Sequence, residues 1–143
     1  MKTRLVLAFD FGLKRIGLAS GDTLTRSATP LATVVHHTSG PDWTAIDLQL
    51  RALGPDLLVV GAPYNDDGSP GSMAASADAF AQALRDRYAL VVERSDERYS
   101  STAAQSLLRE QRASGQRRRR VHKGDIDSAA AAVMLASWLV QQP

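Results

Sequence analysis

The first apolar run of the chain leads into the segment Ala8-Phe9-Asp10-Phe11-Gly12-Leu13-Lys14-Arg15-Ile16-Gly17-Leu18-Ala19. Asp10 stands directly after the apolar residues Leu5 to Phe9, where an unpaired buried carboxylate would lose several kcal/mol of hydration free energy. Gly12 and Gly17, with a second apolar run beside them, are typical of a hairpin whose backbone comes close to a ligand. Asp10 therefore either caps this turn or holds a positively charged partner, and it is the first candidate functional residue.

The overall composition is that of an ordinary globular domain. The chain has 143 residues, of which 44% are hydrophobic and 22% are charged, and we expect a single domain over residues 1–143. No apolar run is long enough to span a membrane, and the N-terminal segment lacks the pattern of a secretory leader. The absence of cysteine excludes disulfides and Cys-ligated zinc, and it favours a cytoplasmic location.

Positive charge is concentrated in one segment near the C-terminus. Residues 109–123 hold seven basic residues and one acid, although the net charge of the whole chain is only +2. The basic residues include an unbroken run, namely Arg117, Arg118, Arg119 and Arg120. Such a run can be a solvated loop, but its density favours contact with the phosphate backbone of a nucleic acid.

The pattern of apolar residues predicts a mixed α/β fold. Short runs with the composition of strands are Leu5–Phe9, Arg15–Ser20, Ala28–Val35, Leu57–Val60 and Leu90–Val92. Longer segments with helical spacing cover residues 43–53, 73–87, 101–110 and 126–140. Residues 39–42 and 61–72 are rich in Gly, Pro, Asp and Ser and are predicted to be loops. This order of strands and helices predicts a mixed sheet with helices on both faces.

Cap signals mark the ends of two predicted helices. Asp42 or Thr44 is placed to cap the first helix, and Gly54 follows its last apolar residue. Asp125 is placed to cap the last helix, where Asp127 would interact favourably with the helix dipole.

Three acidic residues fall where functional sites of α/β sheets form, at the ends of predicted elements: Asp10, Glu97 and Asp127. Each alone has a structural explanation, as a turn cap, a loop charge paired with an arginine, or a residue in the first turn of a helix. Together they would repel one another unless cations neutralised them. Oxygen ligands without cysteine suit Mg²⁺ or Mn²⁺, and a pair of such ions can activate water against a phosphodiester. Beside an arginine-rich segment, this pattern predicts a metal-dependent nuclease.

The histidines predict no competing chemistry. His36 and His37 are adjacent and would face opposite sides of an extended segment, and His122 lies among the basic residues. The chain has no Gly-x-Ser-x-Gly motif, so a serine hydrolase is unsupported.

Four segments taken together resemble the YqgF/RuvX family of the ribonuclease H-like superfamily. They are Asp10-Phe11-Gly12 with Arg15-Ile16-Gly17, Val59–Pro63 with Asp67-Gly68-Ser69, Asp96-Glu97-Arg98, and Lys123-Gly124 with Asp127-Ser128-Ala129-Ala130. The motifs occur in the order of the family and span nearly the whole chain. Members of this family are associated with trimming the precursor of 16S rRNA and with resolving Holliday (four-way) DNA junctions.

The resemblance implies a ribonuclease H-like fold, with a five-stranded mixed sheet whose first three strands are antiparallel. It implies a catalytic two-metal site for Mg²⁺ or Mn²⁺ formed by Asp10, Glu97 and Asp127. It also implies phosphate contacts from the basic residues Arg15, Arg98 and Lys123. The substrate would be junction DNA or the 5′ end of the 16S rRNA precursor, cut to leave 5′-phosphate and 3′-hydroxyl ends. A resolvase that makes symmetric cuts would act as a homodimer.

The sequence departs from the family pattern at several positions. Ala62 and Tyr64 stand where leucines are usual, and Ala103 stands where glutamate is frequent. In contrast to RuvC-type resolvases, no acid ends the predicted strand at Leu57–Val60, which leaves Glu97 as the second ligand. Asp125 remains as a cap or an auxiliary ligand, and Asp96 as a loop charge or an additional ligand.

Two alternative functions fit parts of the pattern. A non-catalytic RNA- or DNA-binding factor in ribosome assembly would need only the arginine-rich segment. An actin-like nucleotide phosphohydrolase would also have an Asp-x-Gly hairpin after its first strand, but such proteins use two domains to enclose ATP.

Overall fold

The sheet is built around β1 (Leu5–Asp10), in the part of the chain described by the computed structural model, residues 3–62, 73–96 and 123–142. β2 (Arg15–Asp22) and β3 (Ala28–His37) follow β1 as an antiparallel meander. β5 (Leu57–Ala62) pairs with β1 in parallel on its other side, and β6 (Val91–Asp96) continues the sheet in parallel. The predicted antiparallel arrangement of the first three strands is therefore confirmed.

The expectation of five strands is wrong, because the sheet has six strands in the order β4-β3-β2-β1-β5-β6. The additional strand, β4 (Gly40–Pro41), pairs with the last two residues of β3 at the edge of the sheet. Gly40 has a φ of +125°, a conformation that glycine adopts without the steric cost of a side chain. The chain can therefore turn back along β3 within a segment whose Gly-Pro composition predicts only a loop.

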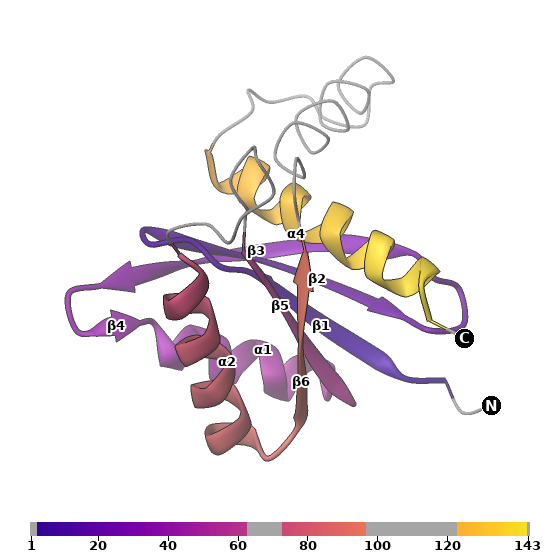
Figure 1. Cartoon of the computed structure of the whole chain (residues 1–143), viewed down its shortest axis with the longest axis horizontal. Coiled ribbons are helices and arrows are strands. Elements are labelled where there is room, and N and C mark those ends of the chain that lie inside the picture. Colours follow the sequence, from indigo (N-terminus) through magenta and orange to yellow (C-terminus); the bar gives the residue numbers. More distant parts are fainter. Residues whose placement is uncertain (1–2, 63–72, 97–122, 143) are drawn as a thin grey trace.

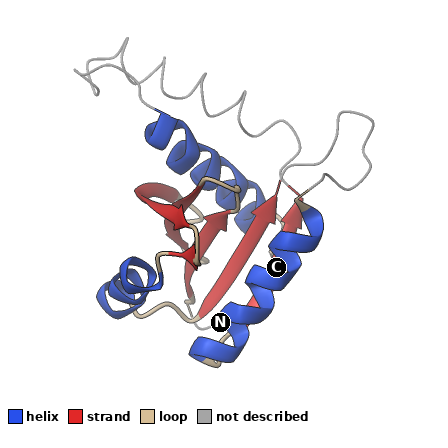
Figure 2. Ribbon diagram, turned by 90° about the vertical axis from the view of Figure 1, so that its left-hand side faces the viewer, coloured by secondary structure: helices blue, strands red, loops and turns tan. Residues whose placement is uncertain are grey.

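The helices lie in two layers on either side of the sheet (Figures 1 and 2). α1 (Trp43–Leu53) and α2 (Ala74–Tyr88) cover one face, and α4 (Lys123–Val140) crosses the other. Helices on both faces confirm the predicted layering. None of the helices in the described ranges is long and apolar enough to cross a membrane.

The ends of α1 follow the local signals in the sequence. The Asp42 carboxylate accepts a hydrogen bond from the Ala45 N–H at 3.1 Å, so Asp42 rather than Thr44 is the N-cap. Gly54 ends the helix in the left-handed conformation, and its N–H donates to the Leu50 carbonyl.

Other element bounds differ from the predictions. α4 begins at Lys123, so Asp125 lies within the helix and the prediction that it is the N-cap is wrong. β5 and β6 continue to Ala62 and Asp96, past the apolar residues that predicted them, because pairing with a neighbouring strand extends each ladder. The helix expected over residues 101–110 lies outside the described residues.

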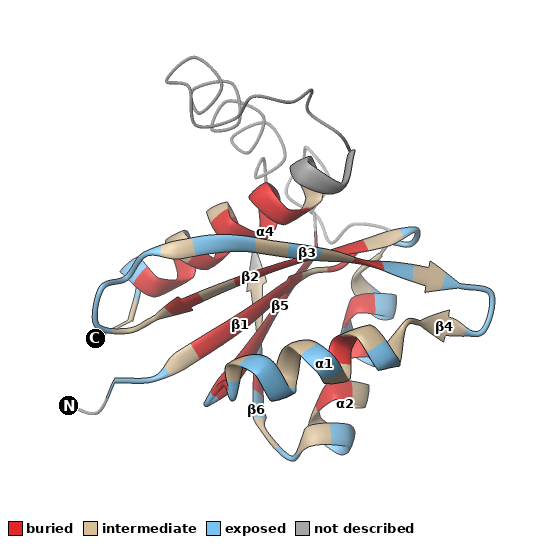
Figure 3. Ribbon diagram, turned by 180° about the vertical axis from the view of Figure 1, so that it is seen from behind, coloured by how far each residue is buried: buried red, intermediate tan, exposed pale blue. Residues whose placement is uncertain are grey.

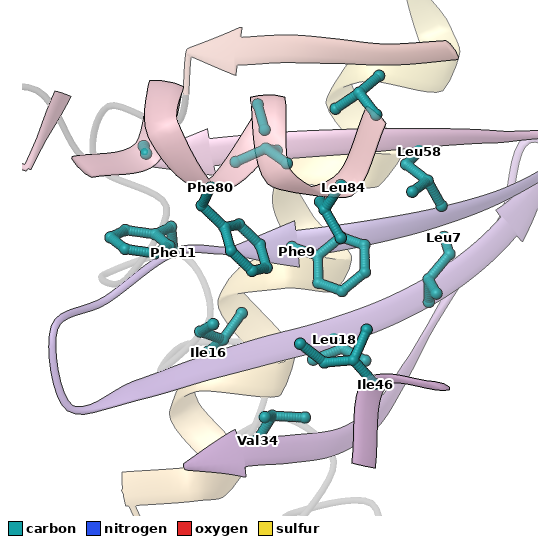
Figure 4. Packing of buried hydrophobic residues seen from close by; sticks show 14 of the residues in the cluster. Leu7, Phe9, Phe11, Ile16, Leu18, Val34, Ile46, Leu58, Phe80 and Leu84 are labelled. Carbon is teal, nitrogen blue, oxygen red and sulfur yellow. The ribbon is translucent and has the colours of Figure 1, made fainter. Parts of the chain in front are cut away.

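The core consists of two clusters, one on each face of the sheet (Figure 3). On the α1/α2 face, Phe9 of β1 packs edge-on against Phe80 of α2, with ring centroids 5.5 Å apart (Figure 4). On the α4 face, Val6 and Ala8 of β1 pack against residues of the helix. The side chains of β1 thus alternate between the two layers, as expected for a strand buried on both faces.

Candidate active site

Asp10 belongs to a row of directly paired residues that crosses the sheet. The register pairs Asp10 with Gly17 on one side and with Gly61 on the other. The row continues from Gly17 to Thr33 of β3 and from Gly61 to Ser95 of β6. It lies at the carboxyl ends of the parallel strands, which is where α/β sheets form their sites.

The Asp10 side chain faces the layer of α4. Val6 and Ala8 pack on the α4 side of β1, while Leu7 and Phe9 pack on the other side. Because successive side chains of a strand alternate between faces, Asp10 continues the row that begins with Val6 and Ala8. Its carboxylate, which is only partly buried, therefore projects beside the beginning of α4.

Gly17 allows α4 to lie directly on the sheet next to Asp10. A Cβ atom at Gly17 would lie 2.0 Å from the carbonyl oxygen of Asp127 and 2.9 Å from the backbone nitrogen of Ser128. No residue with a side chain fits that space without moving the helix. The lack of a side chain at Gly17 therefore brings the backbone of Asp127 over the strand that pairs with Asp10.

A buried hydrogen bond ties the same part of α4 to β3. The hydroxyl oxygens of Ser128 and Thr33 lie 2.9 Å apart, and only 5% of Ser128 is exposed. Thr33 is the residue that pairs with Gly17 across β2 and β3. Consecutive residues of α4 thus contact directly paired residues of the sheet.

The Asp127 carboxylate is held by Arg15. The Arg15 Nε donates to Asp127 Oδ2 at 2.6 Å, and 33% and 27% of the two side chains remain exposed. The guanidinium offsets the repulsion that two carboxylates on one face would otherwise feel. Arg15, expected from the sequence to contact phosphate, therefore pairs with an expected metal ligand and keeps further N–H donors on the same group.

The structure does not describe the side chains of the other site residues inferred from the sequence. Glu97, Arg98 and the run Arg117, Arg118, Arg119 and Arg120 lie outside the described residues. Lys123 begins α4 and Asp96 ends β6, but their side chains belong to the part that is not described. Within residues 3–62, 73–96 and 123–142, no group of three or more His, Cys, Asp or Glu side chains could hold a metal ion.

His36 and His37 lie away from this site. His36 packs edge-on against Phe11, with centroids 5.3 Å apart, on the α1/α2 side of the sheet. His37 Nε2 lies 3.5 Å from a carboxylate oxygen of Asp42, the N-cap of α1. Both positions agree with the expectation that the two neighbours face different surroundings.

Sequence reasoning missed three residues that shape the site. Gly17 was explained by the hairpin turn, yet it lies within β2 and supports α4. Ser128 was part of a motif but had no role, and Thr33 had no signal at all. A small residue in a strand next to a candidate ligand is a signal that could have identified Gly17. The contact between Thr33 and Ser128 needed the tertiary structure.

Known proteins resemble this chain over nearly its whole length. The family model described as "RuvX: Holliday junction resolvase" matches residues 4–141. The chain is 43% identical over 142 residues to a Nitrosococcus oceani protein named "Putative pre-16S rRNA nuclease", covering 99% of this chain and 90% of that one. An Edwardsiella ictaluri protein of the same name is 41% identical, with 99% of each chain covered.

Two solved structures share the fold. One is RuvC of T. thermophilus in complex with a Holliday junction substrate, with a TM-score of 0.50, 14% identity and 92% of each chain covered. The other is the yeast mitochondrial Holliday junction resolvase, with a TM-score of 0.50 and 14% identity, covering 94% of this chain and 77% of that one. The family match and the identities to the bacterial relatives establish that the chain belongs to the RuvX family of nucleases.

Proposed function

We propose that the protein is a divalent-metal-dependent endonuclease that hydrolyses phosphodiester bonds in structured nucleic acid. The observation that supports this most directly is the placement of Asp10 and Asp127, with Arg15, on one face of the sheet around Gly17. These residues are far apart in the sequence, and a purely structural turn cap at Asp10 would not require the other two.

The residues around Asp10 fit a divalent cation. Carboxylate oxygens are the donors that Mg²⁺ and Mn²⁺ prefer. Gly17 and Gly61 pair with Asp10 on either side, and the close approach of α4 over Gly17 brings the backbone of Asp127 next to the strand pair that holds Asp10. We assign Glu97 as the third ligand, because it belongs to the family motif Asp96-Glu97-Arg98 and follows directly after the last residue of β6 in the sequence.

The cations and the residues of the chain would have different roles in catalysis. Bound Mg²⁺ or Mn²⁺ would supply activation of the attacking water and stabilisation of the leaving oxygen. Asp10, Glu97 and Asp127 would hold the cations. Arg15 would use the N–H donors not engaged with Asp127 to bind the phosphate next to the carboxylates.

The substrate class is a structured nucleic acid with an accessible phosphate backbone. The family description and the names of the relatives indicate two candidates, Holliday junction DNA and pre-16S rRNA. Arg98, Lys123 and the arginine run at residues 117–120 would contact the backbone in either case. Cleavage of a junction would further require a two-fold homodimer. Either substrate is consistent with a cytoplasmic location.

Labelled junction DNA and labelled precursor rRNA, incubated side by side with Mg²⁺ or Mn²⁺, test this proposal. We expect the wild-type protein to cut one of them, and Asp10→Asn and Asp127→Asn to lower the rate by roughly 100-fold or more, since several kcal/mol of transition-state stabilisation would be lost. Asp86→Asn, the same change at an exposed position of α2, is the matched control and should cut normally.

Two results would contradict the proposal. One is undiminished cutting by Asp10→Asn, which would exclude the proposed catalytic role of Asp10. The other is wild-type protein that binds either nucleic acid in a strongly salt-dependent way and leaves it intact with both metals, which would support the non-catalytic alternative.

A further inference from the structure

We propose that Thr33 and Ser128 are positioning residues that set the orientation of the Asp127 carboxylate through their hydrogen bond. The inference rests on the proposed nuclease function, because it concerns the same site. Neither residue would touch the substrate; both would act through α4.

Neighbouring positions on α4 correspond to paired positions on the sheet. Gly17 and Thr33 are paired across β2 and β3, while Asp127 and Ser128 are consecutive on α4. Asp127 lies over Gly17, and Ser128 bonds to Thr33 at 2.9 Å. A rotation of α4 about its axis would therefore break the Ser128 contact and move Asp127 at the same time.

The described apolar contacts near the start of α4 restrain rotation of the helix weakly. Ser128 is followed by a run of buried residues with only methyl side chains, namely Ala129, Ala130, Ala131 and Ala132. Small side chains let the helix approach the sheet but give few interlocking contacts that would fix its rotation. Among the side chains of α4 that the structure describes, the bulky residues that interlock with the sheet come later in the helix, at positions such as Met134, Leu135 and Trp138.

The other described contacts between this part of α4 and the sheet fix the orientation of the Asp127 carboxylate less firmly. The contact between Gly17 and the backbone of α4 is steric only, because glycine has no side chain that could form a directional hydrogen bond. The Arg15 side chain is long and one-third exposed, so its guanidinium can move together with the Asp127 carboxylate and keep their hydrogen bond. A buried hydroxyl pair, by contrast, requires a defined distance and angle. Besides the partly exposed bond of Asp127 with Arg15, the buried bond between Thr33 and Ser128 is thus a directional restraint on the residue next to Asp127.

The test uses variants that remove one hydroxyl with little change of shape, Thr33→Val and Ser128→Ala, and their combination. We expect each single variant to lower kcat roughly 10-fold while KM for the nucleic acid changes little, because small misplacements of catalytic groups are costly. The double variant should lose no more than the worse single variant, since both changes remove the same bond. Ser128→Thr and Thr33→Ser, which keep the hydroxyls, should recover activity. Ser137→Ala, at an exposed position of the same helix, is the matched control.

A second readout does not depend on activity. In the metal-free protein, the Nε–H resonance of Arg15 reports its bond to Asp127. We expect that resonance to shift in Thr33→Val and Ser128→Ala, and to stay in place in Ser137→Ala.

The proposal is overturned if folded Thr33→Val and Ser128→Ala proteins keep both wild-type kcat and the wild-type Arg15 resonance, or if the double variant loses the sum of the single effects. If the wild-type protein cuts neither nucleic acid, the proposed function fails, while the Arg15 resonance still decides whether these hydroxyls orient Asp127.

Discussion

Arg15 and Asp127 are separated by 112 positions in the sequence, yet Arg15 Nε lies 2.6 Å from Asp127 Oδ2. The pair joins the start of β2 to the first turns of α4, next to the end of β1. It links the basic residue of the first hairpin to an acid of the last helix, and so defines one charged end of the sheet.

Replacing Arg15 should affect nucleic-acid binding more than stability. The ion pair is partly exposed, so Arg15→Ala should lower the free energy of unfolding by only about 0–1 kcal/mol in urea titrations. Binding should weaken, and its salt dependence should fall by about one unit in the log–log slope, as for a lost phosphate contact. Arg4→Ala, at an exposed residue before the opposite end of β1, is the control. An equal loss of affinity in both variants would show that Arg15 contributes only net charge.

A methyl group at Gly17 should be costly for both fold and activity. Its Cβ would lie 2.0 Å from the Asp127 carbonyl oxygen, so Gly17→Ala should force α4 away and cost about 1–3 kcal/mol. Gly54→Ala is a matched control: the position has open space but a φ of +57°, so strain of about 1–2 kcal/mol is expected far from the site. Thermal unfolding with parallel cleavage assays should show loss of stability in both variants but loss of activity only in Gly17→Ala. Normal cleavage by Gly17→Ala would contradict the importance of this contact.

The contact between α1 and α2 should make stability fall in acid. The Asp47 carboxylate accepts hydrogen bonds from Arg87 at 2.9 and 2.7 Å and from the Tyr88 hydroxyl, and these bonds, with Arg87 first, hold its pKa below the usual value. A carboxyl group with a lowered folded-state pKa stabilises the fold above its unfolded pKa of about 3.9 and loses that contribution as the pH falls further. Urea unfolding at a series of pH values should show this loss in the wild type, a weaker loss in Tyr88→Phe and the weakest in Asp47→Asn. Identical acid profiles for the wild type and Asp47→Asn would contradict it.

His36 should add a second pH dependence closer to neutrality. Its Nε2 is buried without a hydrogen-bond partner among the residues that the structure describes, and desolvation lowers the pKa of His36 despite a hydrogen bond with the Gly12 backbone. A histidine with a lowered folded-state pKa destabilises the fold as the pH falls below its unfolded pKa of about 6.5, because the unfolded chain then binds more protons. His36→Phe keeps a ring beside Phe11 and removes the titration. Melting temperatures between about pH 5 and 7 should therefore fall less steeply in His36→Phe than in the wild type, and parallel curves would refute this.

The sequence predicted the features that depend on neighbouring residues. Asp42 caps the start of α1 and Gly54 caps its end, as their residue types predict. A cap depends only on backbone groups three or four positions away in the sequence. The end of β1 at Asp10 followed from the apolar run before it. The two-residue strand at Gly40 and Pro41 was not predicted, because its Gly-Pro composition is typical of a loop and only its pairing with the end of β3 makes it a strand.

The chemistry of the candidate site was available from the sequence as a set of residue types, with Asp10, Asp127 and Arg15 among them. The positions of these residues relative to one another were not available from the sequence. The register that pairs Asp10 with Gly17, the approach of Asp127 over that glycine and the bond between Thr33 and Ser128 are all long-range contacts. Such contacts depend on how strands align and how a helix packs on them, and no periodicity along the chain encodes either. The sequence by itself therefore determined which groups the protein has, and the tertiary structure decided which of them face one another.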